Sequence, residues 1–141
     1  MNLTLYTSGY NYSRRRCRHV TEWFYKEYLK RYKIEIEVLH RGLKRDGVMG
    51  WCDIEGKTYR PRSFLIEIQS GLQEKDYLTV ICHELWHIYQ FVTGDLRVKA
   101  SKPYYKGQCI EGVDYEDLEH EKEAYKMEKI LYQNYISSLS A

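Results

Sequence analysis

The chain has 141 residues, of which 43% are hydrophobic, and this suits one domain (residues 1–141) built around one core. A formal net charge of +2 is too small to indicate nucleic-acid binding by itself. The N-terminal residues lead into polar sequence, so we expect no signal peptide, no membrane-spanning segment and a cytoplasmic location. Cys17, Cys52, Cys82 and Cys109 form no C-x-x-C pair, which favours free thiols.

The N-terminal half is predicted to contain one helix and three strands. A basic cluster, Arg14–Arg18, leads into the amphipathic stretch Val20–Tyr32, whose apolar residues fit a helical stripe. Alternation with period two, or a short apolar run ended by a turn, is typical of strands. The predicted strands are Ile34–Val38, Val48–Ile54 and Ser63–Ile68.

The C-terminal half is predicted to contain two helices joined by an irregular loop. Apolar residues recur at spacings of three and four after Gly71, between Asp76 as a plausible N-cap and Gly94 as a plausible stop. We interpret Asp95–Val113 as the loop and Tyr115–Leu139 as the last helix. The expected fold is α+β, with a small, mostly antiparallel three-stranded sheet.

The most informative motif is H-E-x-x-H at His83–His87, inside the first of these two helices. Residues four apart lie one turn apart on the same side of a helix, so the imidazoles of His83 and His87 can converge on one metal ion. Glu84 points partly toward the same opening, where it can accept a proton from a metal-bound water. This is the constellation of a zinc metallopeptidase.

Two histidines leave zinc without a third protein ligand, and the last helix offers carboxylates. By helical angle Glu121 lies on the apolar face of that helix, whereas Glu119 and Glu123 point toward solvent. We therefore expect Glu121 to be the third ligand. Glu128 is the second choice, with a hydrogen-bonding or ion-paired role as its alternative, and His120 is the third choice.

The chain resembles the zincin metallopeptidases, in particular the small SprT-like and phage-type minimal domains, over roughly residues 48–128. Five segments carry the resemblance. They are Met49–Cys52 and Tyr59–Arg62 before the strand Phe64–Ile68, Thr79–Gln90 with the H-E-x-x-H motif, the aromatic-Lys-Gly loop Tyr105–Gly107, and the E-x-E-A segment within His120–Ala124.

The resemblance implies a gluzincin-type enzyme in which His83, His87 and Glu121 bind Zn²⁺ and Glu84 is the general base. The substrate would be a protein or peptide, bound by strand addition if Phe64–Ile68 is a sheet edge beside the cleft. Tyr104, Tyr105 and Tyr115 are candidate donors to an oxyanion, although each tyrosine can equally be structural. Gln90 can orient substrate or a ligand, or it can be a plain surface residue.

Two other functions compete with this one. Arg14–Arg18, with aromatic residues nearby, can contact nucleic acid, alone or as part of a protease that acts on DNA-bound proteins. A solvated helix start is the simpler interpretation of these arginines. The third possibility is an inactive metal-binding scaffold, although such a scaffold has no need of Glu84.

Overall fold

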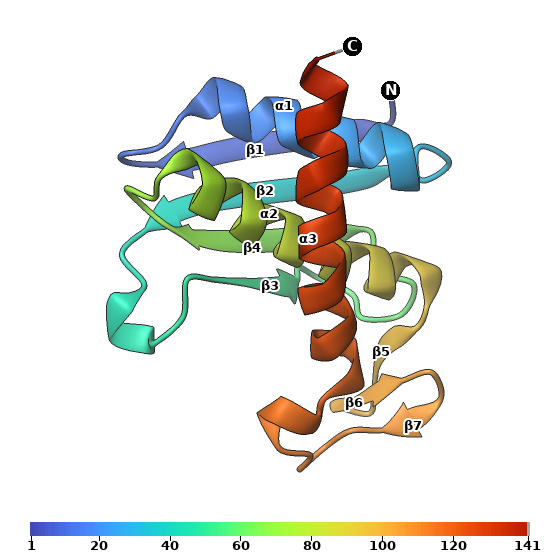
Figure 1. The fold of residues 1–141 in the computed structure, drawn as a ribbon. Coiled ribbons are helices and arrows are strands. Elements are labelled where there is room, and N and C mark those ends of the chain that lie inside the picture. The colour runs from blue at the N-terminus through green and yellow to red at the C-terminus, as the bar shows by residue number, and fades with distance from the viewer. Residues whose placement is uncertain (141) are drawn as a thin grey trace.

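A four-stranded mixed sheet forms the back layer of the fold (Figure 1). In the computed structural model, which describes residues 1–140, the spatial order of the strands is β1-β2-β4-β3. β1 pairs with β2 and β2 with β4 in parallel, whereas β3 runs antiparallel to β4. The strands are β1 (Leu3–Gly9), β2 (Ile34–Arg41), β3 (Gly50–Ile54) and β4 (Ser63–Gln69).

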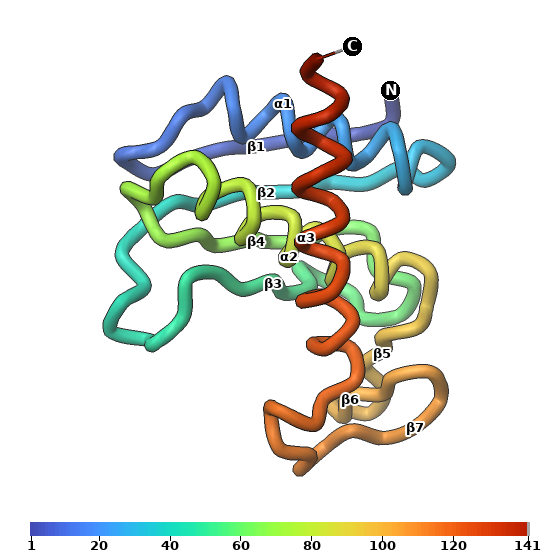
Figure 2. Tube along the Cα trace, viewed as in Figure 1, coloured from blue at the N-terminus to red at the C-terminus, as the bar shows by residue number. Residues whose placement is uncertain are grey.

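The long helices lie on one face of this sheet (Figures 1 and 2). α1 (Arg14–Phe24) continues as the π-helical segment η1 (Tyr25–Leu29), and α2 (Glu74–Thr93) runs beside it. α3 (Glu119–Leu139) crosses in front of α2, and η2 (Lys44–Asp46) and η3 (Tyr115–Asp117) are short 3₁₀ turns. None of the helices within residues 1–140 combines the length and apolar composition that crossing a bilayer requires.

The α+β class is confirmed, but the expected three-stranded, mostly antiparallel sheet is wrong. The strand β1 was missed, and the segment between β1 and β2 is a helix that returns the chain to the same end of the sheet. Such a crossover makes its two strands parallel. The expectation that Phe64–Ile68 is a sheet edge is also wrong, because β4 lies between β2 and β3. The edge strand on this side is β3.

The hydrophobic core lies between the sheet and the helices. Alternate residues of β2, among them Ile36 and Val38, point to the helices and are fully buried. The aliphatic stripe of α2 meets them from the other side and is also buried; it comprises Leu78, Ile81, Leu85, Ile88 and Val92. Because this stripe is fixed on the sheet, the opposite side of α2 faces α3.

The segment Asp95–Val113 is not the irregular loop that was expected. It contains a three-stranded antiparallel sheet of β5 (Leu96–Lys99), β6 (Lys102–Tyr105) and β7 (Gln108–Cys109). Two-residue turns join these strands, and Ala100, Ser101, Lys106 and Gly107 all have positive φ. Turns of this kind match the twist of a hairpin. Strands of two to four residues are too short to show a clear period in the sequence.

The helix boundaries differ from the expected ones at the starts of all three helices, and α3 begins at Glu119 rather than at Tyr115. α1 starts before Val20, because the Ser13 side chain accepts a hydrogen bond from the Arg16 backbone N–H and caps the helix. The basic cluster is therefore the first turns of α1. α2 starts at Glu74, so Asp76 is in its first turn, whereas Gly94 ends it in the left-handed conformation as predicted. All four cysteines are free, as expected.

A buried hydrogen-bond chain ties the start of α2 to the carboxyl ends of β1 and β2. His40 Nδ1 donates to the Ser8 carbonyl at 2.9 Å, so the other ring nitrogen, Nε2, accepts from the Tyr77 hydroxyl at 2.8 Å. The Tyr12 ring stacks on His40 with centroids 3.7 Å apart. Since Tyr77 is near the N-terminus of α2, these hydrogen bonds fix the position of that end of the helix against the sheet.

We expect Tyr77→Phe to lower the free energy of unfolding by about 1–3 kcal/mol, because it leaves the buried His40 Nε2 without a donor. Urea unfolding followed by circular dichroism measures the change. Tyr59→Phe is the matched control, since Tyr59 is 73% exposed and its loss should change little. Equal stability of the two variants would contradict the structural role of this hydrogen bond.

The buried His40 in this hydrogen-bond network also predicts that stability depends on pH. Burial lowers the pKa of His40 below its ordinary 6.5, and the nearby Arg16 cation adds to this effect. Below pH 6.5 the unfolded chain therefore binds a proton that the folded chain resists, and stability falls as the pH falls toward the lowered pKa. Urea titrations from pH 7.5 to 5 should show a smaller decline for His40→Gln than for the wild type. Parallel declines would refute this assignment.

Candidate metal centre

Helix α2 carries His83 and His87 on the side opposite its aliphatic stripe, as their helical angles predict, and Glu84 lies between that side and the stripe. All three are buried, with 5–7% of each residue exposed. The layer that covers the two histidines is the first half of α3. Helix α3 can cross α2 closely at this point because Ala124, one turn after the start of α3, is small and fully buried.

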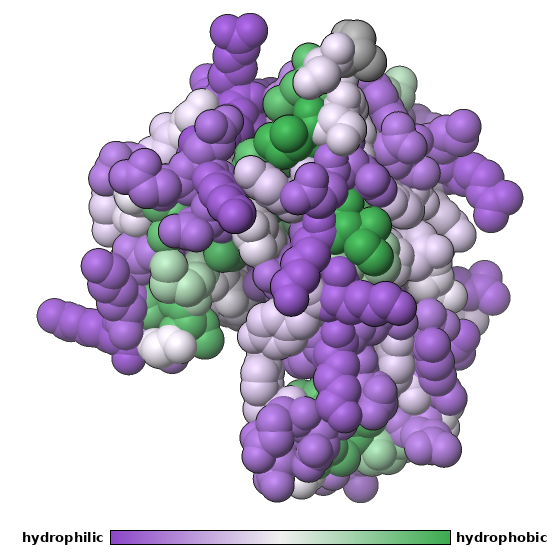
Figure 3. Space-filling view, in the orientation of Figure 1, coloured by the Kyte–Doolittle hydropathy of each residue, from purple (hydrophilic) through white to green (hydrophobic). Residues whose placement is uncertain are grey.

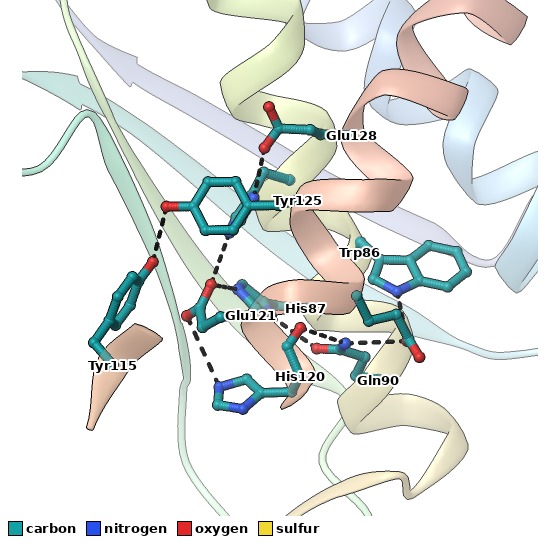
Figure 4. Close-up of polar contacts among 10 residues, drawn as sticks. Trp86, His87, Gln90, Tyr115, His120, Glu121, Tyr125 and Glu128 are labelled. Carbon is teal, nitrogen blue, oxygen red and sulfur yellow. Dashed lines mark hydrogen bonds and ion pairs between the residues drawn. The ribbon is translucent and has the colours of Figure 1, made fainter. Parts of the chain in front are cut away.

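Three donor atoms converge where the two helices cross (Figure 4). Glu121 Oε1 lies 2.9 Å from His83 Nε2 and 3.1 Å from His87 Nε2. The three ligand atoms lie within 4.8 Å of one another, and they are the group among residues 1–140 that could hold a metal ion. Each of the three residues assigned to the metal from the sequence is thus in this one cluster.

The second ring nitrogen of each histidine has its own partner. His83 Nδ1 donates to Glu128 Oε1 at 2.8 Å, and His87 Nδ1 donates to Gln90 Oε1 at 2.8 Å. These bonds fix both rings with Nε2 turned to the cluster. Glu128 therefore lies on the far side of His83 from Glu121, in the hydrogen-bonding role that was its alternative. Gln90 is fully buried, so it is not a surface residue.

The charges in the cluster are strongly coupled. Burial lowers the pKa of His83, but its hydrogen bonds with Glu121 and Glu128 outweigh burial and raise that pKa to about 9. Burial acts to raise the pKa of Glu121, but the hydrogen bonds with His83 and His87 hold it well below its ordinary value. A cation between these atoms takes over the role of the imidazole proton, so the cluster suits a bound cation.

Glu84 lies beside the cluster, against the edge strand. Burial raises the pKa of Glu84 to about 7, against the opposing effect of His87 and His83. A Cβ at Gly50 would lie 3.4 Å from Glu84 Oε2 and only 2.7 Å from Val80 Cγ1. Glycine at position 50 therefore lets β3 approach α2 and the Glu84 carboxylate. No described side chain forms a hydrogen bond with that carboxylate.

A cavity of about 650 Å³ opens onto Glu84 and the three donor atoms. Val48–Cys52 line one side, and Tyr115 and Tyr125 line the other. Figure 3 shows a hollow between the segment that leads into β3 and the lower lobe of the molecule, where η3 leads into α3. Apolar surface gathers on that segment, where Val48 and Met49 are 40% and 44% exposed.

The prediction that Glu123 points to solvent is wrong, whereas Glu119 is exposed as expected. Glu123 accepts hydrogen bonds from Trp86 Nε1 at 2.8 Å, from the Tyr105 hydroxyl at 2.8 Å and from Gln90 Nε2 at 3.1 Å. Glu123 lies at the predicted helical angle, but Tyr105 of β6 covers this side of α3. Glu123 therefore anchors Gln90, which in turn holds His87.

The remaining candidates have separate positions. His120 Nε2 is 3.8 Å from Glu121 Oε2 and is not in the convergent group. Of the three candidate tyrosines, Tyr105 is bound to Glu123, and Tyr115 alone lines the cavity, with its hydroxyl 3.0 Å from that of Tyr125. The Tyr125 ring packs edge-on against His83 at 4.6 Å.

The arginines of α1 do not line this cavity. Arg16 lies over the Tyr77 ring at 4.3 Å and Arg18 donates to the Leu5 carbonyl at 3.2 Å, so both have packing roles. Arg14 and Arg15 are exposed.

The centre thus joins a site for a divalent cation, a buried carboxylate and an open cavity beside an edge strand. This combination suits metal-assisted attack of water on a carbonyl carbon. Comparison with protein-family models, with curated proteins and with solved structures finds no match to this chain.

Proposed function

We propose that the chain is a zinc-dependent metallopeptidase of the zincin type. The convergence of His83 Nε2, His87 Nε2 and Glu121 Oε1 beside the buried Glu84 carries this proposal. Two imidazole nitrogens and one carboxylate oxygen are a ligand set typical of catalytic zinc, which keeps one position open. The cavity on the open side of the cluster supports a catalytic rather than a purely structural metal.

When bound, zinc lowers the pKa of a coordinated water and polarises a substrate carbonyl. Glu84 accepts the proton that this water loses and passes it to the departing amine nitrogen. Its burial, its pKa of about 7 and its lack of a hydrogen-bonded partner among the described side chains support this role. The hydrogen bonds that the two imidazoles donate to Glu128 and Gln90 keep both rings oriented during the reaction.

Strand β3 is the proposed site for the peptide backbone, in place of Phe64–Ile68. One side of β3 pairs with β4, which leaves the N–H and C=O groups of its other side available to an extended chain. Gly50–Cys52 line the same cavity as Glu84. Tyr115 lines the same cavity, and of the three tyrosines expected from the sequence it is the one whose hydroxyl is the candidate donor to a developing oxyanion.

Metal content tests the ligand assignment. We expect about one zinc per wild-type chain after loading, and its loss from His83→Ala and Glu121→Ala, because each variant removes one of three donors. Glu128→Gln should keep zinc but bind it roughly 10- to 100-fold more weakly. Elemental analysis and competition with a chelating dye measure these quantities.

Glu119→Ala is the matched control for the ligand assignment, because Glu119 is exposed on the same turn of α3. It should keep full zinc content. Zinc retained in Glu121→Ala and lost in Glu128→Gln would exchange the roles given to the two glutamates. A wild-type chain that takes up no zinc would remove the basis of the proposal.

Substitution of the general base separates an enzyme from a scaffold. Glu84→Gln should keep its zinc and lose peptide hydrolysis by about 10²- to 10⁴-fold, because the proton of the attacking water has no acceptor. Cleavage of a peptide mixture, followed by mass spectrometry, measures turnover. A wild-type chain that binds zinc but cleaves no peptide would favour the inactive metal-binding scaffold.

A further inference from the structure

A second cavity, of about 330 Å³, lies at the C-terminal end of α2. Figure 1 shows this end of α2 beside β5 and the connection from β3 to β4. Four cationic side chains line the cavity, together with Tyr32, Tyr59 and Phe91, and no carboxylate lines it. The cations are Arg60, Arg62, Arg97 and Lys99. We refer to this cavity as the basic pocket.

The four cations are held in place without being neutralised. Arg60 lies over the Tyr59 ring at 5.4 Å, and Arg62 lies over the Tyr32 ring at 5.0 Å. Lys99 lies 5.3 Å from the centre of the Tyr104 ring. Aromatic faces attract a cation but do not cancel its charge.

Arg97 is held differently, by a hydrogen bond of 2.7 Å from its Nε to the Gly94 carbonyl at the end of α2. None of the four cations pairs with a carboxylate within residues 1–140. Four like charges around one small cavity repel one another, and an anionic ligand relieves that repulsion.

The basic pocket and the cavity of the candidate metal centre share no lining residue, but two elements run from one to the other. Along α2, the last residue that lines the first cavity is His87, and Phe91, one turn later on the same side, lines the basic pocket. Along the edge of the sheet, β3 lines the first cavity, and the connection that follows it reaches Thr58–Arg62 after three residues and lines the second. A peptide extended along β3 would therefore reach the basic pocket.

We propose that the basic pocket binds acidic side chains of the peptide substrate, on one side of the bond that is cleaved. This inference rests on the proposed function, because it takes the cleft to be the site of a peptide. Its position on the two elements that also line the cleft favours an acidic peptide over nucleic acid as the ligand. A nucleic-acid ligand is instead one outcome of the test.

Binding can be tested without turnover, with the zinc-loaded Glu84→Gln chain. The probes are a fluorescein-labelled peptide with a run of glutamates, its twin with glutamines, and a homothymidine oligonucleotide, all followed by fluorescence anisotropy at low salt. We expect the glutamate peptide to bind about ten-fold more tightly than its twin. When Arg60→Asn and Arg97→Gln are added to this chain, the glutamate peptide and its glutamine twin should bind with equal affinity.

The variants are chosen so that folding does not decide the result. Arg60 has a φ of 46°, a conformation that asparagine tolerates well. If this pair fails to fold, Arg62→Gln with Lys99→Gln tests the same pocket. The matched control is Arg14→Gln with Arg15→Gln, which removes two exposed charges outside the pocket and should keep the ten-fold preference.

Two results would overturn the proposal. One is a preference for the glutamate peptide that survives in the pocket variant. The other is loss of oligonucleotide binding, and not of peptide binding, in that variant.

Cleavage by the wild type distinguishes this inference from the proposed function. Among cleaved peptides of a digested proteome, aspartate and glutamate should be enriched on one side of the cut, and the pocket variant should lose that enrichment. Cleavage without enrichment would overturn the pocket and leave the peptidase standing. Charge-dependent binding without any cleavage would support the pocket and remove the peptidase.

Discussion

The partly buried carboxylate of Glu121 meets two imidazoles where α2 and α3 cross, and this contact holds the two helices in register. A buried carboxylate is costly unless it is paired, and His83 and His87 supply the pairing at 2.9 and 3.1 Å. The pairing requires both rings to present Nε2. Glu128 and Gln90 secure this by accepting hydrogen bonds from the opposite ring nitrogens. The outer hydrogen bonds to Glu128 and Gln90 thus set the ring orientations on which the contact with Glu121 depends.

The same crossing of helices joins the small second sheet to the core. Glu123, two residues after Glu121, accepts hydrogen bonds from Trp86 and Gln90 on α2 and from Tyr105 on β6. Its pKa is lowered because these hydrogen bonds outweigh the effect of burial. One carboxylate therefore connects three elements, and it fixes the small sheet beside the start of α3, where Tyr115 of η3 lines the cavity in front of β3.

The mixed sheet explains why the proposed substrate site extends along one line. With β4 in the interior, β3 is the strand that borders the cavity, and Gly50 lets it come close to Glu84. The chain that leaves β3 carries Arg60 and Arg62 into the basic pocket at the end of α2. The proposed catalytic site and the proposed site of substrate selection would then both lie along β3 and α2.

The sequence by itself determined the features that depend on local spacing. The H-E-x-x-H helix, its end at Gly94 and the inward direction of Glu121 follow from the 3.6-residue period and from glycine chemistry, and all were predicted. Only the tertiary structure decided which surfaces meet. Parallel pairing of β1 with β2, the cover of β6 over Glu123 and the position of Glu128 behind His83 depend on contacts between residues far apart in the chain. A helical angle gives the direction of a side chain, but not what lies opposite it.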